Sequence, residues 1–183
     1  MRLYTGKGDQ GTTDLLGDRV AKDDARIEIL GALDEASSAI GLGRAQALTE
    51  TTRELLVTTQ RDLYAIMAEL AFTDELRPDA YRLGEDRVAW LEAATDAITA
   101  GIELPRAFIL PGDSVPGAAL DLARTVVRRA ERQAVALSHN GHVTNPQILR
   151  YLNRLSSLLF VLARAEDAAA GVSPLRAKVS PAR

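Results

Sequence analysis

The sequence predicts an all-α fold, in which five helices form one bundle with a ferritin-like up-down arrangement. Apolar residues recur at three- and four-residue spacing along most of the 183-residue chain, and this spacing is typical of amphipathic helices. Clusters of proline, glycine and polar residues interrupt the pattern, so the helices are expected to be joined by short connections. Alternating strand patterns are almost absent. A single domain of packed helices buries all the apolar stripes together.

The helices can be placed in chain order from their start and stop signals. Asp23 or Asp24 can cap a first helix that begins near Ala25. Four further helices are expected over residues 51–72, 84–99, 118–138 and 147–169. The segment 101–117 contains three prolines and cannot be helical throughout. The helical bundle is therefore expected over residues 24–170.

The two ends of the chain differ from the helical part. Residues 4–18, YTGKGDQGTTDLLGD, contain too much glycine for a helix and too little alternation for a strand. Residues 1–23 are therefore expected to form a glycine-rich segment ahead of the bundle. The tail, residues 171–183, contains proline and basic residues and is expected to be loose.

The composition excludes several classes of protein. The chain has no cysteine, which removes disulfides, thiolate zinc sites and a cysteine nucleophile. With only two histidines, His139 and His142, no protein-built metal site is expected. The net charge of −3 argues against a nucleic-acid partner. The sequence has no signal-peptide pattern and no apolar run of about 18 residues, so a cytoplasmic protein without a membrane partner is expected.

The last two expected helices carry unusual polar residues. Arg124, Arg128 and Arg132 are spaced four residues apart and share one helix face. Such a column either binds an anion, such as phosphate or carboxylate, or pairs with acids on a neighbouring helix or subunit. Asn153 lies in a leucine-rich helix, beside Ser157 and Arg164, where it either sets the packing register or contacts a ligand.

The glycine-rich segment has the residue types that a phosphate-binding loop needs, although it does not match the Walker A motif. The glycines can turn backbone N–H groups inward, and threonine hydroxyls and lysine side chains add donors and positive charge. The residues that would do so are Gly6, Lys7, Gly8, Gly11, Thr12, Thr13 and Lys22. The alternative is a flexible N-terminal tail with turns.

Three segments taken together resemble the PduO-type ATP:cob(I)alamin adenosyltransferases. They are TGKGDQGTT with Lys22 and GALDE, then FILPGD with ARTVVRRAER, then YLNRLSSLLFVLAR, in the same order from Tyr4 to Arg164. The resemblance implies a five-helix homotrimer with one active site at each subunit interface. It also implies transfer of the 5′-deoxyadenosyl group of ATP to the cobalt of reduced cobalamin, with Mg²⁺ and release of triphosphate. The product, adenosylcobalamin, could pass to an acceptor enzyme that depends on it.

The resemblance further implies roles for individual residues. It assigns the nucleotide and its phosphates to Thr5, Gly6, Lys7, Gly8, Gly11, Thr12, Thr13, Lys22, Arg128, Glu131 and Asn153. Asp34 and Arg124 match a pair that members of the family use across the subunit interface. With Lys22 and Arg128, this pair makes up the expected catalytic group. Phe108 matches the aromatic residue that packs against the corrin face.

Four positions depart from the pattern of the family. Ser37 and Ser157 replace an asparagine and an aspartate, and Asp113 and Asp121 stand where a glycine and a histidine are usual. The two added carboxylates lie close to residues expected to hold triphosphate and the corrinoid. They motivate an alternative function, a non-catalytic ATP- or corrinoid-binding trimer that acts as a sensor or cofactor carrier. A purely structural helical bundle is a third interpretation.

Overall fold

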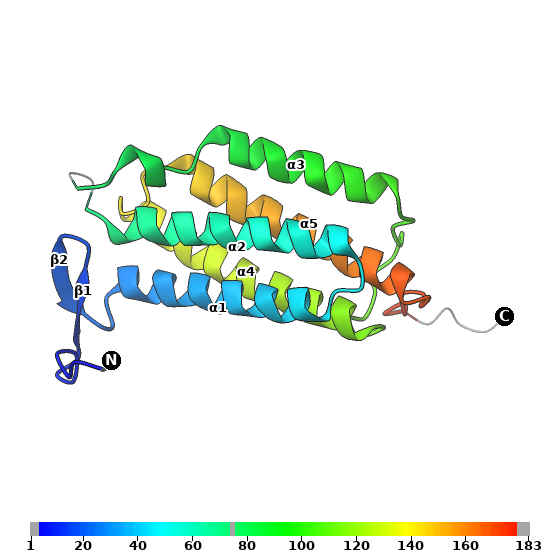
Figure 1. The fold of residues 1–183 in the computed structure, drawn as a ribbon, viewed down its shortest axis with the longest axis horizontal. Helices are drawn as coiled ribbons and strands as arrows, with labels where there is room; N and C mark the ends of the chain where they lie inside the picture. Colours follow the sequence, from blue (N-terminus) through cyan, green and yellow to red (C-terminus); the bar gives the residue numbers. More distant parts are fainter. Residues whose placement is uncertain (1–3, 74–75, 179–183) are drawn as a thin grey trace.

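The computed structural model describes residues 4–73 and 76–178, and the expected five-helix bundle is confirmed over this part of the chain (Figure 1). The helices are α1 (Ala25–Gln46), α2 (Glu50–Ala71), α3 (Glu85–Ala100), α4 (Val115–His139) and α5 (Pro146–Ala169), with a 3-10 turn η1 (Asp79–Tyr81) before α3. Among the described residues, no helix combines the length and the hydropathy that a membrane span requires. The cytoplasmic location stays a prediction.

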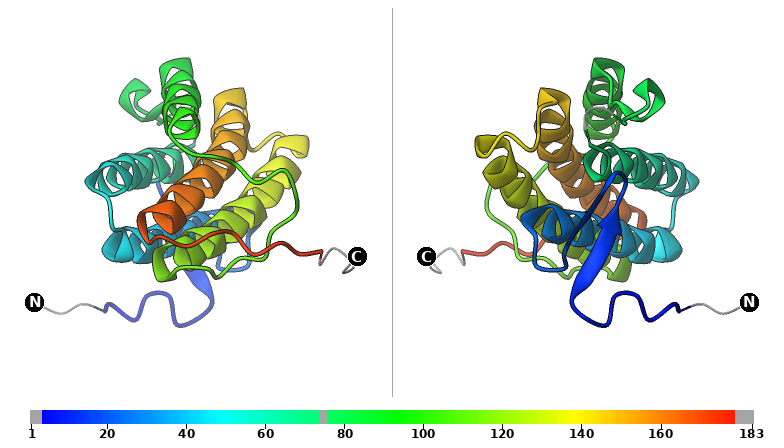
Figure 2. Two further views of the ribbon diagram at one scale, coloured as in Figure 1. Left: turned by 90° about the vertical axis from the view of Figure 1, so that its right-hand side faces the viewer. Right: turned by 90° about the vertical axis from the view of Figure 1, so that its left-hand side faces the viewer.

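Helix α5 lies at the centre of the bundle. It packs against α4, α3 and α2, whereas α1 packs against α4 and α2. The end views show α3 outside the layer formed by the other helices (Figure 2). Most of α5 is buried, including Tyr151, Leu152, Leu155 and Leu159. A helix that is apolar on most of its circumference is stable only when other helices surround it.

Helix α4 begins at Val115, three residues before the predicted start at residue 118. The hydroxyl of Ser114 accepts a hydrogen bond from the N–H of Gly117 at 3.0 Å and so caps the helix. Pro116 lies in the first turn, where its missing N–H has no partner to lose. The prolines of this region therefore begin a helix as well as interrupting one.

The prediction that residues 4–18 contain no strand is wrong. Strands β1 (Thr12–Leu15) and β2 (Asp18–Ala21) form an antiparallel hairpin at the end of the bundle where α1 begins (Figure 1). Its turn contains Gly17, whose φ of +110° favours glycine. The N–H of Leu16 donates to the carbonyl of Ala71 at 3.1 Å, which joins the hairpin to the end of α2. This contact is long-range, so the local sequence pattern did not reveal it.

The tail was predicted to be loose, but its described part pairs with the segment before α4. The N–H of Leu110 donates to the carbonyl of Leu175, and the N–H of Ala177 donates to that of Phe108, both at 2.8 Å. The side chain of Asp113 accepts a third bond, from the N–H of Leu175, at 3.1 Å. Residues 179–183 lie outside the described part of the chain.

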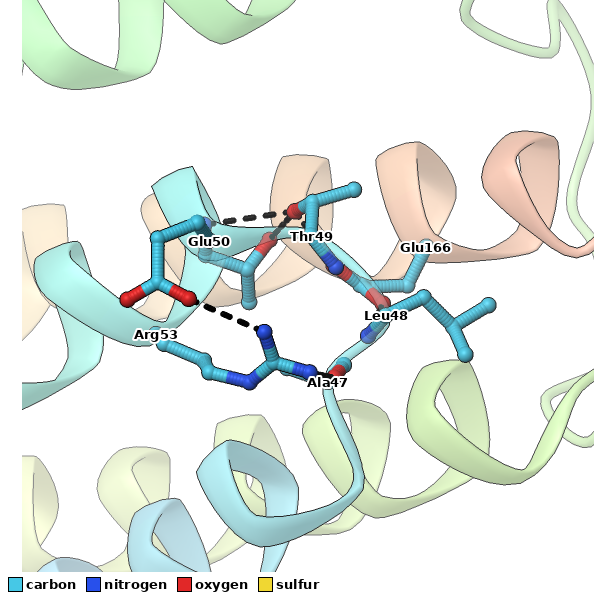
Figure 3. A network of polar contacts seen from close by, with 7 residues as sticks. Ala47, Leu48, Thr49, Glu50, Arg53 and Glu166 are labelled. Carbon is cyan, nitrogen blue, oxygen red and sulfur yellow. Dashed lines mark hydrogen bonds and ion pairs between the residues drawn. The ribbon is translucent and has the colours of Figure 1, made fainter.

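Buried charges join the helices of the bundle, as the carboxylates of Glu166 and Asp62 show. Glu166 of α5 is fully buried and accepts hydrogen bonds from the backbone of Leu48 and from the backbone and hydroxyl of Thr49, in the connection between α1 and α2 (Figure 3). Asp62 of α2 receives the Arg87 guanidinium from α3 at 2.7 Å and the Tyr151 hydroxyl from α5 at 2.7 Å. Burial, with the nearby charge of Asp62, raises the pKa of Tyr151 well above 10.

Candidate active site

Backbone hydrogen bonds hold the glycine-rich segment in a defined loop. The N–H of Asp9 donates to the carbonyl of Gly6, the N–H of Gly11 donates to that of Gly8, and the N–H of Lys22 donates to the carbonyl of Gly11 at 2.8 Å. Gly6 and Gly11 have φ values of +72° and +80°, which side chains other than that of glycine rarely allow. The segment thus forms two successive turns fastened to the end of β2, and the flexible-tail interpretation is not supported.

Two lysines flank this loop. The side chain of Lys22 lies across Gly8, where an added Cβ would come within 3.1 Å of the lysine Nζ. Lys7 and Lys22 are exposed, and neither has a carboxylate partner within the described residues. Both ammonium groups are therefore free to neutralise a bound anion.

Arg19 of β2 holds the loop in place, and sequence reasoning missed it. Its Nη2 donates to the carbonyl of Lys7 and to the Thr12 hydroxyl, both at 2.9 Å, and its Nη1 donates to Asp14 at 2.6 Å. Because the Thr12 oxygen accepts this bond, its hydroxyl hydrogen remains able to donate to a phosphate oxygen. The hairpin register, which pairs Asp14 with Arg19, was the signal that would have revealed this role.

Another group of predicted residues lies on α4 and α5. The amide of Asn153 donates to Glu131 at 2.8 Å and its oxygen accepts from Arg154 at 2.7 Å, which orients the side chain. Arg128 is exposed and has no carboxylate partner in residues 4–73 and 76–178. Arg124, one turn before it, donates to Asp121 at 3.0 Å. Pairing with an acid thus accounts for Arg124, while Arg128 stays open to an anion.

An apolar cavity of about 580 Å³ lies beside these arginines. Its wall combines the segment before α4 with Arg124, Asp121 and Phe160 of the last two helices. Phe108 is 88% exposed at this cavity, and an aromatic ring so exposed indicates a surface that another group covers. A smaller pocket of about 340 Å³ shares Arg124 and Phe160 with it and adds Arg128. Apolar and cationic surfaces therefore adjoin here.

Asp34 lies elsewhere on the bundle, in a groove between α1, α2 and the hairpin. This groove, of about 600 Å³, is lined by Asp34, Thr13 and apolar residues such as Tyr64 and Met67. It has no lining residue in common with the cavity at Phe108. In one subunit, the structure therefore separates Asp34 and Thr13 from Arg124, which the sequence analysis expected to act at one site.

Two of the four departures from the family pattern, the aspartates, have partners within the subunit. Asp121 is 4% exposed and lies between Arg124 and Arg164, whose Nη2 is 2.7 Å from it. Asp113 accepts the hydrogen bond from the tail described above. The carbonyl of Ser37 accepts from Gln60 at 3.0 Å. Both added carboxylates are thus engaged within the subunit, which weakens the argument that they repel a triphosphate.

Among the described residues, no three His, Cys, Asp or Glu side chains come together as metal ligands. A magnesium ion here would need ligands from a substrate, because Mg²⁺ in nucleotide sites commonly takes phosphate oxygens and water as most of its six ligands.

Residues 3–166 match the family described as cobalamin adenosyltransferase. The chain is 43% identical over 177 residues to the corrinoid adenosyltransferase of Bacillus subtilis, covering 94% of this chain and 90% of the relative. It is 41% identical over 182 residues to the corrinoid adenosyltransferase PduO of Salmonella typhimurium, covering 98% of this chain but 54% of that longer relative.

Solved structures similar to this chain are also of corrinoid adenosyltransferases. A variant of the PduO-type ATP:corrinoid adenosyltransferase from Lactobacillus reuteri, complexed with cobalamin and ATP, superposes with a TM-score of 0.87 at 30% identity, covering 97% of each chain. A second variant of that protein, complexed with ATP, gives a TM-score of 0.85 at 30% identity over 96% of this chain and 100% of the other.

Proposed function

The chain belongs to the cobalamin adenosyltransferase family, and from this premise we propose that it transfers the 5′-deoxyadenosyl group of ATP to the cobalt of cob(I)alamin. The observation that carries the proposal is Arg128, which has no carboxylate partner among the described residues and lies beside the apolar cavity lined by Phe108 and Phe160. The arrangement offers a cationic place for a triphosphate next to an apolar place for a corrin ring, and we therefore call this cavity the corrinoid cavity. The engaged state of Asp113 and Asp121 argues against the non-catalytic alternative.

In the proposed reaction, cob(I)alamin is the nucleophile and the protein supplies no catalytic base. The electron pair on cobalt attacks C5′ of the ribose, the Co–C bond forms, and the C5′–O bond breaks with both electrons going to triphosphate. Negative charge then gathers on the leaving phosphate oxygens. Lys7, Lys22 and Arg128 stabilise that charge, because fixed cations aimed at developing charge lower the barrier. Orientation of the two substrates supplies much of the rest.

Phe108 has a second task in this scheme. Cobalt(II) is hard to reduce while a lower axial ligand stays bound. An apolar ring against the corrin face offers no donor atom and excludes water, so it favours a four-coordinate cobalt that is easier to reduce. The partner of Phe108 in this role is Phe160, which lines the same cavity.

Magnesium would arrive with the nucleotide. With no cluster of acidic side chains among the described residues, the triphosphate oxygens would supply most of its ligands. When bound, the ion would supply positive charge to the leaving triphosphate. Lys7 and Lys22 would hold the same phosphates from the protein side.

We also propose that the protein works as a homotrimer. The glycine loop lies at the hairpin end of the bundle, and the segment with Phe108 lies at the opposite end (Figure 1). The 22-residue helix α1 separates these ends by about 33 Å, at 1.5 Å per residue. That is too far for one ATP to reach from the loop to a corrin ring in the same subunit. A loop from one subunit and the α4–α5 face of another can meet around the three-fold axis, where Asp34 would approach Arg124.

Mixed trimers test this arrangement. One variant carries Lys7→Ala with Lys22→Ala and has an impaired loop, and the other carries Arg128→Ala and has an impaired α4–α5 face. Each alone is expected to be nearly inactive. Co-expressed in equal amounts, they should recover about a quarter of wild-type activity, because one interface in four combines an intact loop with an intact face. No recovery in trimers of confirmed mixed composition would contradict the interface site.

The function itself is tested by an anaerobic assay with chemically reduced cobalamin, ATP and Mg²⁺, following the loss of cob(I)alamin absorbance. Adenosylcobalamin should form, and the rate should fall in Arg128→Ala but not in Arg82→Ala, which alters an exposed arginine beside η1. ATP binding without any product would favour the sensor or carrier alternative. Transfer of the product to an acceptor enzyme stays a prediction.

A further inference from the structure

A second cavity adjoins the corrinoid cavity and has a different character. It has a volume of about 570 Å³ and lies between the segment 102–106, the end of α5 and the tail segment 172–176. We call it the arginine cavity, because Arg106, Arg164 and Arg176 line it and Glu103 is the one acidic residue that does so. The two cavities share Pro105 and Arg106, so a ligand in one can extend into the other.

Arg164 lines this cavity and carries donors that the subunit does not use. Its side chain is buried, with the residue 3% exposed, and its Nη2 is 2.7 Å from Asp121 and 2.9 Å from Asp167. Its Nε and Nη1 are also buried, and neither has a hydrogen-bond acceptor among the described residues. Leaving a buried N–H without an acceptor is unfavourable, so the Arg164 guanidinium keeps hydrogen-bonding capacity at the base of the cavity.

The balance of charge suits an anion. Asp121 and Asp167 offset Arg164 and Arg124, which leaves Arg106 and Arg176 against Glu103 and thus one surplus positive charge. Arg106 and Arg176 are exposed and have no carboxylate partner in the described part of the chain. Backbone pairing between Ile109 and Arg176 fixes the tail over the cavity. Guanidinium groups match the oxygen geometry of phosphate.

The Arg164 side chain also contacts Phe160, a residue of the corrinoid cavity. Its guanidinium carbon lies 5.5 Å from the ring centre of Phe160, and that ring lines the corrinoid cavity. A ligand bound through phosphate at Arg164 would therefore lie next to a ligand on the Phe160 ring.

We propose that the arginine cavity binds the phosphodiester of cobalamin's nucleotide tail while the corrin ring occupies the corrinoid cavity. The inference rests on the proposed function, which requires the tail to leave the cobalt when Phe108 excludes the lower ligand. A phosphodiester carries one negative charge, equal and opposite to the surplus of the cavity. Inorganic phosphate presents the same kind of oxygen atoms as the phosphodiester, so it can compete for the same arginines. The site would distinguish complete corrinoids from cobinamide, which lacks the nucleotide and its phosphodiester.

The first experiment compares KM for cobalamin and for cobinamide in the wild type, Arg106→Ala, Arg176→Ala and the double variant. Arg82→Ala serves as a matched control. The proposal predicts that Arg176→Ala, which alters a residue outside the corrinoid cavity, raises KM for cobalamin at least fivefold, with KM for cobinamide changed less than twofold and kcat retained. A KM that stays constant for cobalamin, or that rises equally for both corrinoids, would overturn the proposal.

The second experiment needs no turnover, so it separates failure of this site from failure of the proposed function. Equilibrium dialysis of the two corrinoids in the Co(II) state should show tighter binding of cobalamin than of cobinamide, and the double variant should remove the difference. Inorganic phosphate at millimolar concentration should weaken cobalamin binding only. If phosphate binds but the two corrinoids bind equally well, the cavity takes a free anion and the assignment to the corrinoid tail is wrong.

Discussion

Arg164 of α5 and Arg128 of α4 lie on neighbouring helices, but their side chains have opposite environments. Arg164 is buried and sits against Asp121 and Asp167, and Asp167 accepts a further bond from Ser114 at 2.6 Å. Arg128 is exposed, with no carboxylate partner among the described residues. Two arginines on neighbouring helices thus end in opposite environments.

The contrast shows how the fold separates structural charges from functional ones. A buried charge is tolerated only when a partner offsets its loss of hydration, so the inner network must be nearly complete within the subunit. An exposed cation keeps its hydration and needs no partner. It can therefore remain unpaired until a ligand binds, with little effect on the free energy of unfolding. Arg164 has features of both classes, since Nη2 is paired whereas Nε and Nη1 have no acceptor among the described residues.

The largest effect is expected from breaking the inner network. Asp121→Ala leaves the buried Arg164 with one carboxylate fewer and should lower the free energy of unfolding by about 3–5 kcal/mol. Urea unfolding of the variant and the wild type measures this difference in the free energy of unfolding. Glu85→Ala removes one partner of the exposed Arg150–Glu85 pair and should cost less than about 1 kcal/mol. Equal effects of the two changes would mean that burial does not distinguish these pairs.

Arg128→Ala tests the outer face. The variant should lose about 100-fold in kcat/KM for adenosylation, comparable to the loss of one donor that stabilises transition-state charge. Its melting temperature should stay close to that of the wild type, because no described carboxylate depends on this side chain. A large loss of stability with little loss of activity would place Arg128 in the structural class.

Arg19→Ala sharpens the comparison, because Arg19 is exposed yet ties the glycine loop to the hairpin, through one hydrogen bond to the Lys7 carbonyl and two to strand β1. The loop should still form but should bind nucleotide less well, so KM for ATP is expected to rise about tenfold with a smaller change in kcat, the pattern of a lost ground-state contribution. Steady-state kinetics at saturating corrinoid measures it. A fall in kcat at constant KM would contradict a role in positioning the loop.

The smallest effect concerns the buried Tyr151. Because burial and Asp62 raise its pKa above 10, the folded protein keeps a proton that the unfolded chain loses, and the stability falls as the pH rises above about 10. Tyr151→Phe should flatten the dependence of unfolding free energy on pH there, and Tyr64→Phe, at an exposed position, should not. An unchanged slope in Tyr151→Phe would show that other groups cause it.

Part of the candidate site was readable from the sequence and part was not. The glycine and lysine composition of the loop and the spacing of the arginines indicated anion binding. The sequence could not tell that Arg124 pairs with Asp121 while Arg128 stays open, because both occupy equivalent positions of one helix face. It also missed Arg19, whose contacts depend on the hairpin register.

By itself, the sequence determined the five helices, since helical hydrogen bonds and apolar stripes join residues three or four positions apart. Only the tertiary structure decided the hairpin, which depends on the contact of Leu16 with Ala71, and the paired tail. It alone also decided which charges are buried and that Asp34 and Arg124 face different surfaces of one subunit. These features arise from contacts between distant residues, and packing of the whole chain selects them.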